Sequence, residues 1–116
     1  MPLDVRVSAG TGDAGIVNVV PVGDLDLSTA PELERSLVGV QTDGGPVLLD
    51  LRGVRFMDSS GLRVILAADA RARSNGSRLM LLPGPPGVQR VFQLTLLDRR
   101  LEFVDDPRGD PQQVET

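Results

Sequence analysis

The sequence predicts a single α/β domain with a mixed, mainly parallel sheet of four to five strands and helices packed on it. Two short and nearly continuous apolar runs, residues 46–51 and 77–82, are typical of strands that are buried on both faces. A stretch with helical periodicity follows each run, as a crossover between parallel strands requires. The length of 116 residues corresponds to one ordinary domain.

The first two elements are predicted to form a β-hairpin. Residues 3–8 alternate apolar and polar side chains, which indicates an edge or half-buried strand. The glycine-rich residues 9–15 predict a turn, and the β-branched residues 16–27 predict a second strand. Pro21 lies within this second strand. Because proline cannot donate a hydrogen bond to a neighbouring strand, it predicts an edge position or a bulge.

The first helix is predicted over residues 28–40. Thr29 is followed three residues later by Glu32, which is the spacing of a capping box. Leu33 and Leu37 lie one turn apart and are expected on the buried face. A turn with two glycines then leads into the first of the two buried runs.

A second helix is predicted from Ser60 to about Ser74, and the Asn-Gly pair that follows is expected to end it. Its apolar stripe comprises Leu62, Val64, Ile65, Leu66, Ala67 and Ala68, whereas Asp69, Arg71 and Arg73 are expected outside. After the second buried run, the sequence predicts a stiff loop at 83–87, a short helix within 88–97 and a last strand at 101–104. Val88, Val91, Phe92 and Leu96 form the apolar face of that short helix. Residues 1–106 are assigned to the domain and 107–116 to a polar C-terminal tail.

The composition removes several classes of chemistry. The chain has no cysteine and no histidine, which excludes disulfides, thiolate sites and the usual general base. All twelve basic residues are arginine, so no lysine chemistry is available. The net charge of −4 argues against a nucleic-acid partner. We therefore expect a protein that is not an enzyme and that has no cofactor and no metal. The three aromatic residues, Phe56, Phe92 and Phe103, are expected in the core.

The N-terminal sequence has no apolar segment typical of a signal peptide, and no apolar run approaches the length of a membrane span. A cytoplasmic location without a membrane partner is the expectation from these two observations.

The segment FMDSSGLRVIL, residues 56–66, places Asp58, Ser59 and Ser60 where the second helix is predicted to begin. Asp58 or Ser59 can cap the free backbone N–H groups of that helix. Capping explains one polar side chain but not three in a row. Gly61 is a poor helix former and is expected to leave the first turn open to another protein. We therefore favour a recognition site over a cap alone.

Three carboxylates, those of Asp24, Asp26 and Asp58, could gather near one another and hold a hard cation. They lack a regular loop spacing, which makes surface acids the favoured interpretation. A response-regulator receiver domain, with Asp50 as its phosphate acceptor, is an alternative with a similar order of strands and helices. That alternative is disfavoured because the chain has neither an acidic pair after its first strand nor a lysine. The glycines at 83–87 likewise lack the spacing of a dinucleotide site.

Three segments together resemble one known family. They are VGDLDLSTAPEL at 22–33, VLLDLRGVRFMDSSGLRVIL at 47–66, and VQRVFQLTLLDRRLEFVDD at 88–106. The chain is similar in these segments to STAS domains, and its compact form resembles bacterial anti-sigma factor antagonists. The Asp-Ser-Ser-Gly-Leu motif between a buried strand and a helix is the most specific part of this resemblance.

The resemblance implies a partner-switching phosphoprotein in transcription regulation, connected with stress response or sporulation. The unphosphorylated form is expected to bind an anti-sigma factor serine kinase and so release a sigma factor. The kinase then phosphorylates the first serine of the motif, Ser59, and a phosphatase reverses the step. The domain is expected as a monomer or weak dimer. The partner-binding residues are expected to be Asp24, Asp26, Asp58, Ser59, Ser60, Gly61, Leu62 and Arg63.

One departure from the family concerns Arg63, which stands where many members have glycine. Two other functions remain open alternatives. The first is a STAS scaffold or sensor that acts through assembly. The second is a nucleotide- or ligand-binding module, with residues 83–87 and the Asp-Ser-Ser turn lining the pocket.

Overall fold

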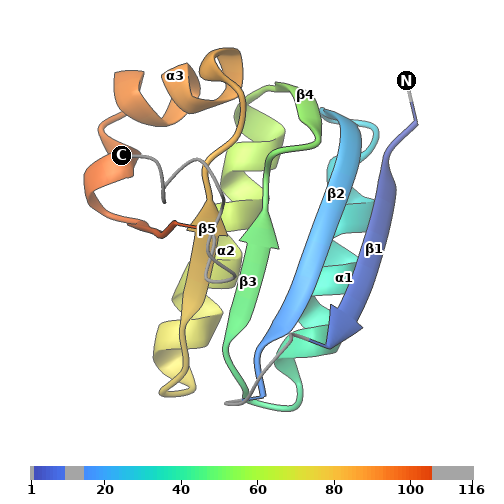
Figure 1. Cartoon of the computed structure of the whole chain (residues 1–116), viewed down its shortest axis with the longest axis vertical. Coiled ribbons are helices and arrows are strands. Elements are labelled where there is room, and N and C mark those ends of the chain that lie inside the picture. Colours follow the sequence, from blue (N-terminus) through green and yellow to red (C-terminus); the bar gives the residue numbers. More distant parts are fainter. Residues whose placement is uncertain (1, 10–14, 106–116) are drawn as a thin grey trace, which may run out of the picture.

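The computed structural model describes residues 2–9 and 15–105, and these residues form one six-stranded mixed sheet with helices. The strands are β1 (Asp4–Ala9), β2 (Val17–Leu25), β3 (Val47–Asp50), β4 (Val54–Met57), β5 (Leu79–Leu82) and β6 (Glu102–Phe103). Their order across the sheet is β1-β2-β3-β5-β6, and β4 pairs with β2 beyond the end of β3. Figure 1 shows the strands side by side with the helices behind and above them.

The N-terminal hairpin is the antiparallel part of the sheet, with Asp4 opposite Val22 and Ala9 opposite Val17. All the other strand pairs are parallel, so crossover segments join them. The helices α1 (Ala30–Gln41) and α2 (Ser59–Ser74) cover the same face of the sheet (Figure 1). The helix α3 (Pro86–Leu94) and the 3₁₀ turn η1 (Leu97–Arg99) connect β5 to β6. The predicted fold class is confirmed.

The core lies between the sheet and the helices. Every residue of β3 and β5 is buried, as their continuous apolar sequences predict. Leu33 and Leu37 on α1 are fully buried, which confirms the predicted face of that helix. Phe92 and Phe103 pack edge to face with ring centroids 5.1 Å apart. These contacts join the last helix and the last strand to the core.

The number of strands differs from the prediction because the sequence pattern does not predict β4 (Val54–Met57). Residues 54–57 have no room for an alternating pattern and follow β3 after only three residues. The sequence therefore predicts a loop at these residues, because only the pairing with β2 makes them a strand. Parallel pairing of Leu25 with Met57 makes this segment a strand and raises the count to six.

Pro21 lies in a central strand, so the predicted edge position is wrong. The N–H groups of Val17 and Gly23 both point to the same side of β2 and donate to Pro46 O and Gly53 O. Alternation places residue 21 on that side as well. There β3 has ended its pairing at Leu49 and β4 has not yet begun, so no donor is needed. A register irregularity does occur, but between Gly23 and Asp24.

Asp69 and Leu96 lie elsewhere than predicted. Asp69 is buried and forms an ion pair with Arg73, with Oδ2 and Nε 3.0 Å apart. Asp69 lies on the same buried face of α2 as Leu62 and Ile65. The sequence predicts it outside because aspartate is a polar residue type. Leu96 lies beyond the end of α3, in a left-handed conformation with φ of 61°, and it is exposed.

The predicted turn at 9–15 and the predicted tail at 107–116 lie largely or wholly outside the described residues. In the part of the chain that the structure describes, no helix has the length and apolar content needed to cross a membrane.

Leu49→Ala should lower the free energy of unfolding by about 2–5 kcal/mol, because Leu49 is fully buried in the middle of β3 and its truncation leaves a cavity. Urea denaturation followed by circular dichroism measures the change. The matched control is Leu94→Ala on α3, where the side chain is 77% exposed and the change should stay within about 0.5 kcal/mol. Equal destabilisation by the two substitutions would contradict the assignment of the core.

Candidate functional site

The carboxyl ends of β2 and β4 meet at one edge of the sheet. Their parallel register sets Asp24 opposite Phe56 and Leu25 opposite Met57. The pairing continues one residue further, since the Asp58 N–H donates to Leu25 O at 3.2 Å. The start of α2 and the loop that leads into α1 are therefore brought to the same edge, which is the upper end of the molecule in Figure 1.

Asp58 is the N-cap of α2. Its backbone is extended, with φ of −111° and ψ of −170°, and its Oδ1 accepts a hydrogen bond from the Ser60 N–H at 2.8 Å. The Leu62 N–H donates to Asp58 O at 3.3 Å and starts the helical ladder. Asp58 alone therefore provides the cap that the sequence left open between Asp58 and Ser59.

Ser59 occupies the first position of α2 and is exposed. Among the described residues, no partner forms a hydrogen bond with its hydroxyl. Ser60 follows it and is half-buried. The first serine of the motif thus presents its hydroxyl to solvent without a structural task in capping.

Gly61 is buried rather than open to a partner, so the expectation drawn from the sequence is wrong. A Cβ atom at this position would lie 2.6 Å from Leu25 Cγ and 2.9 Å from Met57 Cγ. Such distances are far inside van der Waals contact. Glycine is needed here because α2 approaches β2 and β4 closely, and Leu62 beside it is also buried.

Asp26 holds the turn that joins β2 to α1. Its Oδ1 accepts hydrogen bonds from the Ser28 hydroxyl at 2.8 Å and from the N–H groups of Ser28 and Thr29 at 3.0 and 3.2 Å. The bond from the Ser28 hydroxyl is the main cause that lowers the pKa of Asp26 below its ordinary value, and the hydrogen bonds from the two N–H groups act in the same direction. Asp26 is therefore a structural residue of this turn.

The predicted capping box at Thr29 and Glu32 is wrong. Thr29 is the N-cap residue of α1, but its side chain makes no capping hydrogen bond to the helix. Its hydroxyl instead donates to Asp24 O at 2.8 Å and accepts from the Asp26 N–H at 2.9 Å. Thr29 thus fixes the end of β2, which a local sequence pattern could not reveal.

The three carboxylates reach the same edge without forming a metal site. Asp26 and Asp58 are each engaged with backbone N–H groups, and Asp24 also has an interaction partner. Within residues 2–9 and 15–105, no group of three or more His, Cys, Asp or Glu side chains is placed to hold a metal ion. Asp26 and Asp58 therefore each stabilise the turn in which they lie, and all three acids are half-buried.

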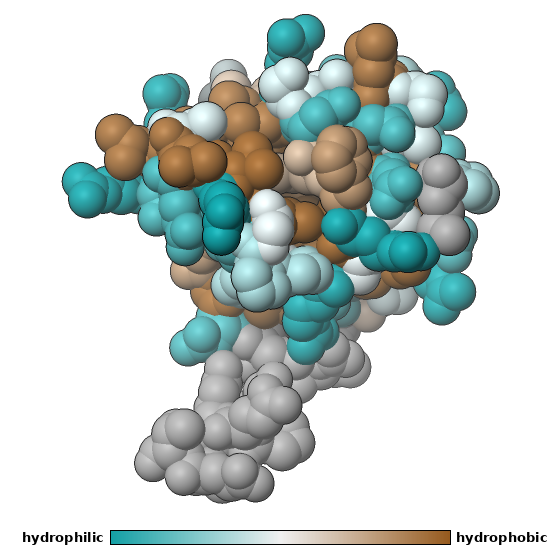
Figure 2. Space-filling model, turned by 90° about the horizontal axis from the view of Figure 1, so that it is seen from above, coloured by the Kyte–Doolittle hydropathy of each residue, from teal (hydrophilic) through white to brown (hydrophobic). Residues whose placement is uncertain are grey.

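Two exposed apolar side chains on this edge were not predicted. Phe56 on β4 is 51% exposed instead of buried in the core, and Leu27 in the turn after β2 is 76% exposed. Adjacent strand residues cannot both face one side, so Met57 in the core leaves Phe56 outside. Figure 2 views the molecule from this end, where apolar side chains lie among polar ones. Arg63 is exposed in α2, as expected.

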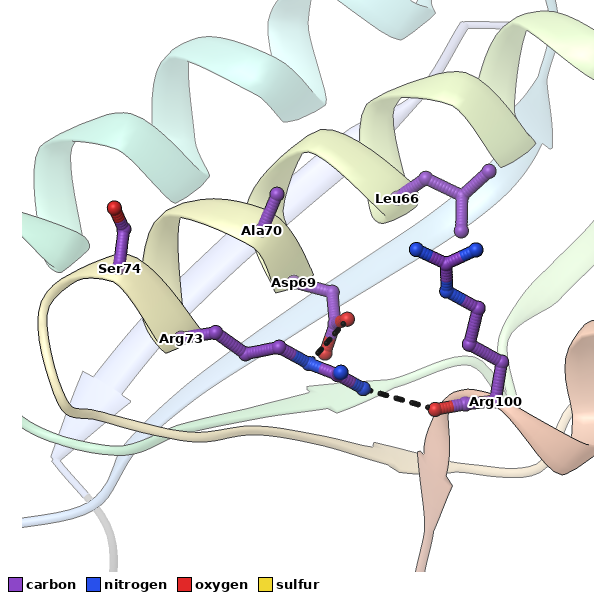
Figure 3. Close-up of a pocket in the computed structure, with 6 residues that line it drawn as sticks. All are labelled: Leu66, Asp69, Ala70, Arg73, Ser74 and Arg100. Atoms are coloured by element: carbon purple, nitrogen blue, oxygen red, sulfur yellow. Dashed lines mark hydrogen bonds and ion pairs between the residues drawn. The ribbon is translucent and has the colours of Figure 1, made fainter.

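A groove with a volume of about 510 Å³ lies elsewhere on the molecule. It is lined by Leu66, Asp69, Ala70, Arg73, Ser74 and Arg100. Figure 3 shows Arg73 extended between Asp69 and Arg100, where it donates to Arg100 O at 3.0 Å. Neither residues 83–87 nor the Asp-Ser-Ser turn lines this groove, so it is not the pocket expected for a ligand-binding module.

A family model described as "Mlab, STAS domain" matches residues 9–105. The chain belongs to the STAS domain family. This STAS domain is 30% identical to the anti-sigma-B factor antagonist of Listeria monocytogenes over 102 residues, which cover 87% of this chain and 90% of that protein. The resemblance read from the sequence is confirmed.

Solved structures share the fold of this STAS domain. An anti-sigma factor antagonist from Mycobacterium paratuberculosis has a TM-score of 0.77 and 25% identity, with 91% of this chain and 88% of that chain covered. The Bacillus cell fate determinant SpoIIAA in its phosphorylated form has a TM-score of 0.66 and 19% identity, with 95% and 97% covered. At 19% identity the likeness to SpoIIAA shows the fold alone.

Gly61→Ala should destabilise the STAS domain by about 1–3 kcal/mol, because the added methyl group overlaps Leu25 and Met57. Gly87→Ala in α3 is the matched control, since a Cβ there meets nothing within 4 Å. That control should be neutral or stabilising by up to about 1 kcal/mol. Thermal melts of the two variants should therefore move in opposite directions or differ widely, and a melting temperature of Gly61→Ala at or above that of the control contradicts the close approach.

Asp58→Ala should cost about 1 kcal/mol of stability, because it removes the cap of α2. Ser59→Ala should change the free energy of unfolding by less than about 0.5 kcal/mol, because its hydroxyl has no partner among the described residues. Chemical denaturation of both variants measures the difference. A larger loss for Ser59→Ala than for Asp58→Ala would reassign the cap to Ser59.

Proposed function

We propose that this protein is an anti-sigma factor antagonist controlled by phosphorylation of Ser59. In this proposal the unphosphorylated form binds an anti-sigma factor that is a serine kinase, and the sigma factor is released. The kinase then transfers the γ-phosphoryl group of ATP to Ser59 Oγ, with ADP and the hydroxyl proton as the other products. The observation that carries the proposal is the exposed hydroxyl of Ser59 beside a helix cap that Asp58 alone provides.

The names of relatives support the class of function. The Listeria relative and the Mycobacterium structure are both described as anti-sigma factor antagonists. A fold relative, SpoIIAA, has been solved in a phosphorylated form. The lack of histidine and lysine in this chain is consistent with action by binding rather than by catalysis.

The partner surface in this proposal is the edge formed by the ends of β2 and β4 and by the first turn of α2. Ser59 and Arg63 are exposed on α2, and Asp24 lies at the end of β2. Phe56 and Leu27 add exposed apolar area to this edge. Asp26 and Gly61 support the surface from behind it, and Leu62 does so as well.

Electrostatics explains how one hydroxyl can switch binding. A phosphoryl group adds about −1.5 to −2 charges. At the start of a helix an anion is tolerated, so the fold should survive the modification. If the partner brings a carboxylate within about 6 Å, the repulsion costs roughly 3–6 kcal/mol at an effective dielectric of about 20–40. That cost corresponds to about a hundredfold or more in affinity.

The proposal places the protein in the cytoplasm as a monomer or weak dimer, with a kinase and a phosphatase as its partners. The ligand-binding alternative gains no support from the groove described above. The groove beside Asp69 and Arg73 shares no lining residue with the Asp-Ser-Ser turn or with residues 83–87.

The experiment is incubation with a candidate kinase and ATP, followed by mapping of the phosphorylated residue and measurement of affinity. Ser59→Ala should bind the kinase but accept no phosphate. The control Ser60→Ala should remain a substrate. Ser59→Asp should keep its melting temperature and lose at least about tenfold in affinity, because it carries a permanent charge. Phosphate on Ser60, no phosphate at all, or wild-type affinity of Ser59→Asp would contradict the proposal.

A further inference from the structure

Arg63 is an exposed cation for which the described residues provide no counter-ion. Within the described residues, no hydrogen bond or ion pair involves its side chain. Its own helix offers no carboxylate at the spacings that bring side chains together, since positions 59, 60, 66 and 67 are Ser, Ser, Leu and Ala. An arginine in this situation has a free guanidinium available for an anion that arrives later.

Ser59 lies four residues before Arg63 in the same helix, and both side chains are exposed. Residues at this spacing have their Cβ atoms about 5–6 Å apart on one helix face. The order is also favourable, because an acid that precedes a base by four residues is the better orientation. A phosphoryl group on Ser59 would thus form within reach of the Arg63 guanidinium.

The same helix already contains an ion pair with this spacing and order. Asp69 precedes Arg73 by four residues, and Asp69 Oδ2 lies 3.0 Å from Arg73 Nε. The backbone of α2 therefore holds an acid and an arginine in contact at this separation. Ser59 and Arg63 have the same relation to one another, and only the anionic group is missing.

We propose that Arg63 is the internal counter-ion of phosphorylated Ser59. This inference rests on the proposed function, in which Ser59 is the acceptor. Arginine suits the role because its planar guanidinium can donate two parallel hydrogen bonds to phosphate oxygens. Phosphorylation would then act twice on the partner surface, since it adds negative charge and also draws the free cation away from the partner.

The other charged groups on this edge also affect the ionisation of a phosphate on Ser59. Asp58 lies next to Ser59, and Arg55 lies on β4. Asp24 lies near the end of β2, and Asp26 lies in the turn that follows. The three carboxylates disfavour the dianionic phosphate. Asp24 and Arg55 already have interaction partners, which leaves Arg63 as the unpaired cation of this set.

The test uses protein with phosphoserine installed at position 59 during synthesis, so that no kinase is needed. A ³¹P NMR titration gives the midpoint of the second ionisation of the phosphate. Removal of a cation about 5 Å away in Arg63→Gln should raise this midpoint by about half a pH unit at low salt. The matched control is Arg35→Gln, which removes the same charge from an exposed site on α1 and should shift the midpoint by less than about half as much, because the interaction weakens with distance.

Arg63→Lys should restore at least half of the difference, because it keeps the charge. The difference between wild type and Arg63→Gln should shrink in about 1 M NaCl, where the Debye length is about 3 Å. Equal midpoints for wild type and Arg63→Gln, or a difference that salt does not reduce, would overturn the inference. A kinase that ignores Ser59 would instead overturn the proposed function and leave this measurement unaffected.

Discussion

The first turn of α2 lies so close to the ends of β2 and β4 that position 61 has no room for a side chain. This contact sets the depth of the helix against the sheet. It also sets where the cap must lie, because Asp58 is tied to Leu25 O on one side and to the Ser60 N–H on the other. The exposed position of Ser59 follows from these bonds. The edge is thus a surface whose geometry is determined from inside the domain.

Elements with continuous or strictly periodic apolar patterns could be predicted from the sequence. Residues 46–51 and 77–82 contain β3 and β5, and the buried face of α1 lies at Leu33 and Leu37. A strand that is buried on both faces is apolar throughout, so it can be recognised without knowing which strands it pairs with. The start of α2 was also predictable, because capping is a local interaction between neighbours in sequence.

The parts that could not be predicted depend on contacts between distant segments. The strand β4 exists only because β2 runs beside it, and Thr29 turns away from its helix to bond Asp24 O. The sequence marks Gly61 as unusual, but the atoms that exclude a side chain there belong to Leu25 and Met57 and not to a partner protein. A glycine in a helix signals close approach without saying whether the neighbour is internal or external.

The position of Pro21 has a consequence for folding. The strand β2 changes partner from β3 to β4 on one side, and the proline occupies the single interval where that side requires no donor. If the register of β2 shifted by two residues, Pro21 would lie opposite a carbonyl group that now accepts a hydrogen bond from a backbone N–H. Because proline has no N–H, that hydrogen bond would be lost. Proline generally weakens a strand, but Pro21 therefore favours the one register in which Leu25 pairs with Met57.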